Sequence, residues 1–224
     1  MLALVADTSG RDGSIALAIG DPRGDCKLIE ILPLTGGAFS AQLIPRIAAL
    51  LSNHRFAKND LDGFIVVDGP GSFTGLRVGL AAIKALAEVL VKPIAVVSLL
   101  EALAQSGDLT GNVTSAFDAG RGQIYIGKYR ISADMPHRIS EGISTMGEFI
   151  RTISGQCVIT PDTRIASLAE AAGAAVHLAP APGLDLIAHL GWQKIAAGHT
   201  VLPENLEANY IVRVNAEVAH PGGI

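Results

Sequence analysis

The residues best placed to do chemistry lie in a glycine-rich loop, Gly69-Pro70-Gly71-Ser72-Phe73-Thr74-Gly75. It joins an apolar run, which we expect to be a buried strand, to the start of a predicted helix. Free N–H groups and the positive end of the helix dipole at such a place bind anions. The loop lacks the lysine of a P-loop and the third glycine of a dinucleotide fingerprint. A tight structural turn and an anion site at Gly69, Gly71 and Ser72 therefore both stay open.

Two acids, Asp7 and Asp118, end predicted buried strands in the two halves of the chain. Acids at this place in α/β cleft proteins position metal-bound or hydrated phosphate. Asp7, Thr8, Ser9 and Asp118 are therefore further candidates for binding a nucleotide or an anion. The alternative is that each acid caps its own turn through its side chain, and spacing does not separate the two readings.

Familiar catalytic patterns are missing from the sequence. None of the six histidines has another four residues away, so no H-x-x-x-H metal pair exists. There is no G-x-S-x-G elbow, and no C-x-x-C pair. We expect Cys26 and Cys157 to be small buried apolar side chains. The sequence thus predicts neither catalytic residues nor metal ligands.

Composition indicates a globular protein. The 224 residues are 49% hydrophobic and 17% charged, with a net charge of −4. No basic stripe is present, which disfavours binding of nucleic acid by this chain alone. No apolar run approaches the ~20 residues of a membrane span, and the apolar start stops at Asp7 without a basic flank. We expect a cytoplasmic protein with no membrane contact.

The order of predicted elements repeats in the two halves. Each half begins with a buried strand, an acid, a small-residue turn and a return strand, at a period of about 110 residues. This pattern predicts two similar α/β lobes, residues 1–106 and 107–224, with the last helix able to pack back on the first lobe. Predicted strands are 2–6, 14–19, 27–34, 64–68, 93–97, 113–118, 123–130, 157–160 and 175–178; predicted helices are 40–52, 76–90, 99–105, 146–153, 164–172 and 184–197.

The predicted helix 76–90 is apolar almost all round, with Arg77, Lys84 and Glu88 near one stripe. A surface helix is apolar on one face only. The helix is therefore either a core element or a surface that a partner covers, and the residues leave both readings open.

Three segments carry a resemblance to a known family: 7–9, 69–79 and 118–125. They resemble, in that order, the landmarks of the TsaB (YeaZ) family of glycoprotease-like proteins, and Tyr210 and Arg213 add a looser match near the end. The resemblance implies an actin-like, sugar-kinase-like ATPase fold, made of two ribonuclease-H-like lobes.

The resemblance also implies a function. Proteins of this family are non-catalytic partners of TsaD, which makes N6-threonylcarbamoyladenosine in tRNA, and a TsaE-type ATPase joins them. TsaD holds its metal with an H-x-x-x-H pair; the similar positions here are Leu99 and Leu103, which cannot ligate a metal. We expect a homodimer when the chain is alone, tRNA contact only through the complex, no tightly bound cofactor, and ATP or ADP at the complex interface. The expected partner interface comprises Phe73, Leu76, Leu80 and Ile83.

Two other functions compete. A small ATPase or kinase of the same superfamily would use Asp7, Gly71 and Asp118 around a nucleotide. A peptidase, the older label of the family, has no nucleophile–base pair or metal site to support it in this sequence.

Overall fold

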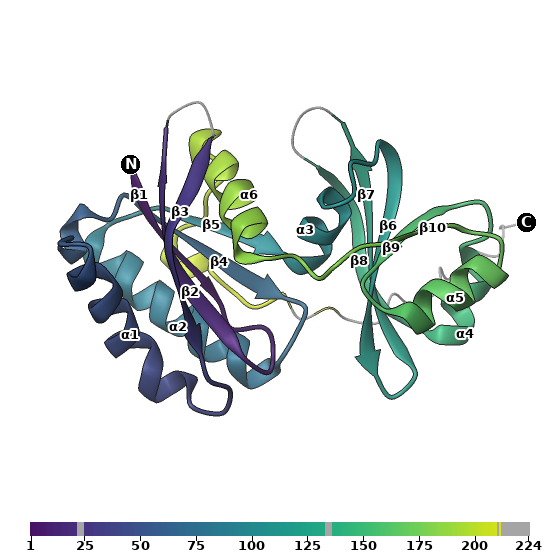
Figure 1. Cartoon of the computed structure of the whole chain (residues 1–224), viewed down its shortest axis with the longest axis horizontal. Helices are drawn as coiled ribbons and strands as arrows, with labels where there is room; N and C mark the ends of the chain where they lie inside the picture. The colour runs from purple at the N-terminus through teal and green to yellow at the C-terminus, as the bar shows by residue number, and fades with distance from the viewer. Residues whose placement is uncertain (22–24, 133–135, 210, 212–224) are drawn as a thin grey trace, which may run out of the picture.

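The protein consists of two lobes, each built on one sheet (Figure 1). The computed structural model describes residues 1–21, 25–132, 136–209 and 211. In this part of the chain, two five-stranded sheets are present. The predicted Tyr210–Arg213 landmark lies outside the described residues.

The first sheet has the strand order β3-β2-β1-β4-β5. Its first three strands form an antiparallel meander, whereas β4 and β5 run parallel to β1. The strands are β1 (Leu2–Asp7), β2 (Gly13–Gly20), β3 (Cys26–Leu34), β4 (Gly63–Gly69) and β5 (Ile94–Ser98). Side chains of β1 alternate between the two faces of the sheet, so both faces are apolar and both need a covering layer.

The second sheet repeats this topology, with the order β10-β9-β6-β7-β8. Its strands are β6 (Gly111–Gly120), β7 (Gln123–Ile131), β8 (His137–Thr145), β9 (Cys157–Thr160) and β10 (Ala175–Leu178). Here too the first three strands are antiparallel and the next two are parallel to the first. The predicted internal repeat and the α/β class are thus confirmed.

The sequence prediction missed strand β8. Its polar sequence has mostly exposed or half-buried side chains, because β8 is an edge strand. It forms through backbone pairing with β7, from Gln123 opposite Thr145 to Arg130 opposite His137. An edge strand without a continuous apolar face gives little periodic signal.

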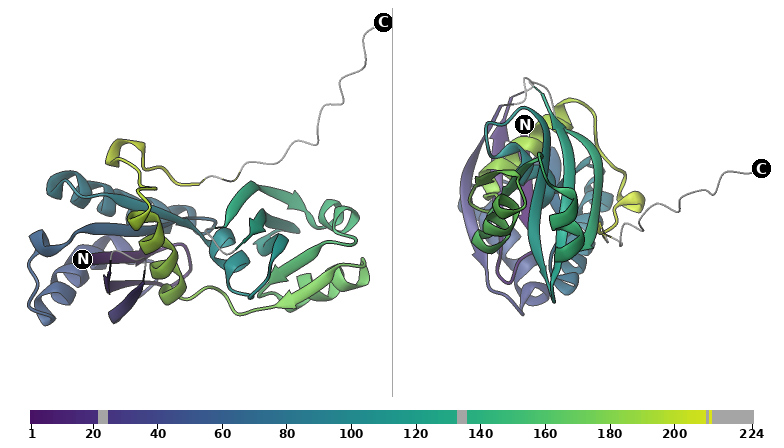
Figure 2. Two further views of the ribbon diagram at one scale, coloured as in Figure 1. Left: turned by 90° about the horizontal axis from the view of Figure 1, so that it is seen from above. Right: turned by 90° about the vertical axis from the view of Figure 1, so that its right-hand side faces the viewer.

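Helices cover the outer faces of both sheets (Figures 1 and 2). On the first lobe these are α1 (Phe39–Asn53) and α2 (Phe73–Leu90); on the second, α4 (Met146–Thr152) and α5 (Thr163–Ala171). Two further helices, α3 (Leu99–Gln105) and α6 (Leu184–Ala196), lie between the sheets. Short 3₁₀ turns occupy η1 (Lys58–Asp60) and η2 (Pro203–Asn205).

The two inner helices cross over between the lobes. Helix α6, which comes from the second half, packs against all five strands of the first sheet. Helix α3, which follows the first sheet, packs mainly on β6 and β7 of the second. Each lobe therefore has part of its core supplied by the other half of the chain, and the lobe boundary at residue 106 stays a prediction.

Candidate functional site

The glycine-rich loop forms a tight junction with the turn after β1. The backbone N–H of Ser72 donates to the carbonyl oxygen of Ser9 at 2.6 Å. An added Cβ would overlap the backbone of Ser9 at Gly71 in the loop and the backbone of Thr8 at Gly75 in α2, and it would overlap the Thr8 side chain at Gly79. These three glycines, one in the loop and two in α2, are therefore needed for close packing, which supports the tight-turn reading of this loop.

Helix α2 begins three residues earlier than predicted. The Ser72 side chain caps the helix by accepting a hydrogen bond from the backbone N–H of Gly75 at 3.3 Å, so the helix starts at Phe73 rather than Leu76. The loop itself is therefore short. A cavity of about 300 Å³ lies beside this helix start, with Arg11, Ser40 and Thr74 in its lining.

Asp7 and Asp118 both accept hydrogen bonds within their own turns. Asp7 Oδ1 accepts from the backbone N–H of Ser9 at 2.8 Å and from its hydroxyl at 2.5 Å. Asp118 Oδ1 accepts from the backbone N–H of Gly120 at 2.8 Å. These contacts fit the capping alternative. Among the predicted binding residues, the structure brings Asp7, Thr8 and Ser9 together with Gly71 and Ser72; Asp118 lies on the second sheet.

The structure corrects the prediction that Leu76, Leu80 and Ile83 of α2 form the partner interface. Leu76, Leu80 and Ile83 are 3%, 5% and 0% exposed, and they pack in the core between α1, α2 and the first sheet. Their side chains cannot contact a partner, because the chain's own sheet covers them. The apolar perimeter of α2 indicated a core face here. Phe73 differs: it is 52% exposed, with the guanidinium of Arg77 3.7 Å from its ring centroid.

A different stripe of α2 faces outward, and α1 lies beside it. Eight small or apolar side chains are exposed here, and we call them the outer α1–α2 face: Ala41, Ile44, Ala48 and Ala49 on α1, and Phe73, Ala81, Ala85 and Val89 on α2. Arg46, Arg77 and Glu88 are exposed on the same two helices. Ile44 and Val89 are 49% and 73% exposed. These eight side chains are therefore exposed and do not form part of the core.

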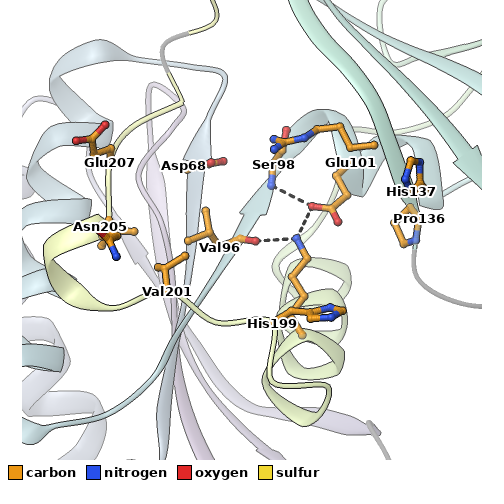
Figure 3. A pocket seen from close by; sticks show the side chains of 13 residues that line it. Asp68, Val96, Ser98, Glu101, Pro136, His137, His199, Val201, Asn205 and Glu207 are labelled. Atoms are coloured by element: carbon orange, nitrogen blue, oxygen red, sulfur yellow. Dashed lines mark hydrogen bonds and ion pairs between the residues drawn. The ribbon is translucent and has the colours of Figure 1, made fainter.

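A cavity of about 570 Å³ lies between the lobes, and sequence reasoning missed it (Figure 3). On one side, Lys194 of α6 donates through Nζ to Glu101 Oε2 of α3 at 2.6 Å and to the carbonyl oxygen of Val96 at 2.7 Å. The same Glu101 oxygen accepts from the backbone N–H of Ser98 at 3.4 Å. The cavity thus contains a buried ion pair that ties the two inner helices together.

A second group of polar residues includes Asp68, which lines this cavity, and residues in contact with Glu141. Glu141 of β8 accepts hydrogen bonds from the Tyr129 hydroxyl and from the Asn209 side-chain amide. The backbone N–H of Asn209 donates to the carbonyl oxygen of Asp68 at 3.0 Å. Asp68 Oδ1 is buried and has no hydrogen-bond partner among the described residues.

Burial has a large effect on the acid–base properties of this group of residues. Burial, and then the neighbouring Glu141 carboxylate, raise the pKa of Asp68 to about 7. The same two causes, burial first, raise the pKa of Tyr129 well above its usual value. One signal in the sequence could have pointed here: Asp68 ends a buried strand, as Asp7 and Asp118 do.

The described residues provide no clear metal site. They contain no group of three or more His, Cys, Asp or Glu side chains placed to hold a metal ion. Leu99 packs against the apolar layer under α6, and Leu103 is buried in the cluster that α3 forms with β6 and β7. Among the described helices, none has the length and hydropathy needed to cross a membrane.

Known proteins match this chain over most of its length. The family model described as "TsaD: tRNA N6-adenosine threonylcarbamoyltransferase" matches residues 33–186, more than half of the chain. A "tRNA threonylcarbamoyladenosine biosynthesis protein TsaB" from Bacillus subtilis is 38% identical over 131 residues, 58% of this chain and 56% of the relative. The protein of the same name from Haemophilus influenzae is 30% identical over 171 residues, 74% of this chain and 66% of the relative.

The chain belongs to the TsaB (YeaZ) family.

Solved structures of the TsaB (YeaZ) family confirm the fold. "YeaZ from Pseudomonas aeruginosa" superposes with a TM-score of 0.73 at 22% identity, covering 94% of this chain and 99% of that one. A second Pseudomonas aeruginosa structure, described as similar to peptidase YEAZ, gives the same TM-score at 21% identity. The predicted actin-like fold of two ribonuclease-H-like lobes is thus confirmed. The sequence match spans little more than half of the Bacillus subtilis relative.

The three sequence landmarks of the TsaB family occupy two places in this fold. Segments 7–9 and 69–79 form the glycine junction between β1 and α2. Segment 118–125 forms the turn between β6 and β7, at the equivalent place of the second lobe. The segments that follow β1 and β6 therefore lie at corresponding positions in the two similar sheets.

Proposed function

We propose that this chain is a non-catalytic subunit in the biosynthesis of N6-threonylcarbamoyladenosine in tRNA, and that it pairs with a TsaD-type transferase. Family membership and the names of the Bacillus subtilis and Haemophilus influenzae relatives support the pathway. The observation that carries the pairing is the outer α1–α2 face. A subunit that exposes Ala, Ile, Phe and Val side chains on two neighbouring helices, with Arg77 and Glu88 among them, has a surface suited to a protein partner.

The size of this face and its mixture of small and large apolar side chains suit a helical partner. Alanines let another helix approach closely, while Ile44, Phe73 and Val89 provide larger apolar contacts. Helices of this length extend about 25 Å, so two side by side present roughly 500 Å², the same order as the roughly 800 Å² per partner of standard interfaces. In the absence of TsaD, the same face suits a second copy of this chain, which accounts for the homodimer in the proposal.

The remaining parts of the proposal follow from the chemistry of the chain. Leu99 and Leu103 have apolar surroundings, which supports a subunit that holds no catalytic metal. With a net charge of −4, this chain contacts tRNA only through the complex. In this proposal a TsaE-type ATPase joins the complex. ATP or ADP binds at the complex interface rather than tightly to this chain. The tRNA modification takes place in the cytoplasm.

Light scattering coupled to size-exclusion chromatography tests the pairing, using this chain and TsaD from the same organism. The expected result is a one-to-one complex. Ala85→Glu, in the outer α1–α2 face, should abolish it, because the partner would have to bury an unpaired charge. Ala171→Glu makes the same change at an exposed end of α5 and should leave the complex intact.

Two results would count against the proposal. If the unaltered chain does not associate with TsaD, with or without nucleotide and a TsaE-type protein, the subunit role is wrong. If the two variants associate equally well, the placement of the interface on α1 and α2 is wrong. ATP hydrolysis by the purified chain alone would instead favour a small ATPase that uses the cavity beside Arg11 and Ser72.

A further inference from the structure

The cavity between the lobes has the size of a small-molecule site. Its volume is about 570 Å³, within the roughly 300–1,000 Å³ of typical ligand sites. Its walls come from both halves of the chain, from Val96 of β5 to His137 of β8 (Figure 3). The landmark residues Asp7, Gly71 and Asp118 do not line it. The cavity is therefore separate from the turns where the sequence predicted an anion or nucleotide site.

The lysine and the arginine that line this cavity already have acidic partners. Lys194 Nζ lies 2.6 Å from Glu101 Oε2, and it also donates to the carbonyl oxygen of Val96 at 2.7 Å. Arg138 Nη1 lies 3.6 Å from Glu141 Oε2. Each of these cations is therefore balanced by a carboxylate, which leaves no lysine or arginine charge free to bind an anionic ligand.

Two acidic side chains of the lining lack such partners. Asp68 is mostly buried and points from the end of β4 into the space between the lobes (Figure 3). Its Oδ1 is enclosed without a hydrogen-bond partner among the described residues, which leaves Oδ2 as the oxygen on the cavity side. Glu207 is exposed, and within the described chain its carboxylate has no hydrogen bond or ion pair. The unbalanced charge of the cavity is therefore negative.

This lining favours an organic cation. A carboxylate that is partly shut off from water and lacks a donor is costly, so an N–H donor with positive charge would stabilise it. The apolar lining residues Val96, Val201 and Leu206 suit a chain of methylene groups. A metal ion held by protein ligands fits less well, because the described residues contain no group of three His, Cys, Asp or Glu side chains placed for one.

We propose that the cavity between the lobes binds a small aliphatic diamine: one ammonium group donates to the Asp68 carboxylate, the methylene chain lies along the apolar lining, and the second ammonium group pairs with Glu207 at the rim. Asp68 provides most of the affinity, because it is mostly buried, whereas water screens the exposed Glu207. This inference goes beyond the proposed partner and pathway. Its test uses the chain alone, so its outcome does not depend on them.

Isothermal titration calorimetry with 1,4-diaminobutane tests the site on the full chain. The titration is made at pH 8, because burial and Glu141 raise the pKa of Asp68 to about 7 and the carboxylate must be ionised. The expected result is one site with a Kd of about 1 mM or tighter. Butane-1,4-diol has the same length without the charges and should not bind. Binding of succinate in place of the diamine would overturn the proposal, because it would mean that the cavity selects an anion.

Matched variants separate the cavity from general attraction to an acidic protein. Asp68→Asn should weaken diamine binding about tenfold or more, as expected for the loss of a hydrogen bond to a charged group. Glu207→Gln should weaken it about threefold. Glu170→Gln changes the net charge by the same amount at an exposed site on α5 and should leave the affinity unchanged.

The location of the bound diamine gives an independent check. In NMR spectra, the backbone amide signals of Val96 and Leu206, which line the cavity, should shift as the diamine is added, and those of α5 should not. The proposal is wrong if no saturable binding occurs, or if Asp68→Asn and Glu170→Gln bind the diamine equally well. An unchanged affinity in Glu207→Gln would overturn the second ammonium contact and with it the assignment of a diamine.

Discussion

Lys194 and Glu101 form a buried ion pair between the two inner helices, with Nζ 2.6 Å from Oε2. The two residues come from opposite halves of the chain, α6 and α3, and their side chains are only 16% and 11% exposed. Each helix packs chiefly on the sheet of the other half. The ion pair therefore links the two inner helices and helps to hold the two similar lobes together.

Removing one partner of this pair should destabilise the protein. Lys194→Met leaves Glu101 buried without its cation, so we expect a loss of about 3 kcal/mol in the free energy of unfolding. Combining Lys194→Met with Glu101→Leu should recover most of the loss, because no unpaired charge remains. Urea denaturation of the three proteins measures this. A double variant no more stable than the single one would show that packing, rather than charge, dominates at this place.

Stability should depend on pH through Asp68. Its pKa is raised from 3.8 to about 7 in the folded protein, so the folded state binds a proton that the unfolded state has lost. Unfolding free energy should therefore fall as pH rises between about 4 and 7, and stay low above that range. Asp68→Asn should flatten this dependence and be the more stable protein at pH 8. Equal slopes of stability against pH for both proteins would contradict the prediction.

The glycines of α2 should be intolerant of larger side chains. At Gly75 a Cβ would overlap the carbonyl oxygen of Thr8, which is backbone and cannot move away easily. Gly75→Ala should therefore destabilise by about 2 kcal/mol or more, despite the higher helix propensity of alanine. Gly147→Ala is the matched control, because this α4 glycine has no neighbour within 4 Å and should tolerate the change. Thermal unfolding compares the two, and equal melting temperatures would argue against tight packing of α2.

Neighbouring positions on α2 should respond in opposite ways to a charge. Leu80→Glu places a carboxylate in the core beneath the helix, and we expect it to prevent stable folding. Ala81→Glu places the same group on the exposed side and should change the unfolding free energy by less than about 0.5 kcal/mol. Circular dichroism during urea titration distinguishes them. A strongly destabilised Ala81→Glu would mean that this face is covered within the chain.

Local sequence patterns predicted most of the elements. Buried strands such as Leu2–Asp7 are continuous apolar runs, and the repeated acid and small-residue turn after β1 and β6 indicated two lobes of one topology. These features depend on residues close together in the chain, so they can be recognised without tertiary structure. The start of α2 was predicted too late, because the cap at Ser72 lies within what read as a loop.

The sequence by itself determined the two-lobed α/β class, the positions along the chain of the strands other than the polar edge strand β8, and the family. Only the tertiary structure decided which face of α2 is covered, since an apolar perimeter fits a core and an interface equally well. It alone assembled the group formed by Asp68, Tyr129, Glu141 and Asn209, whose members are distant in sequence. The physical reason is that burial and the approach of like charges arise from packing between lobes, and no local pattern records such packing.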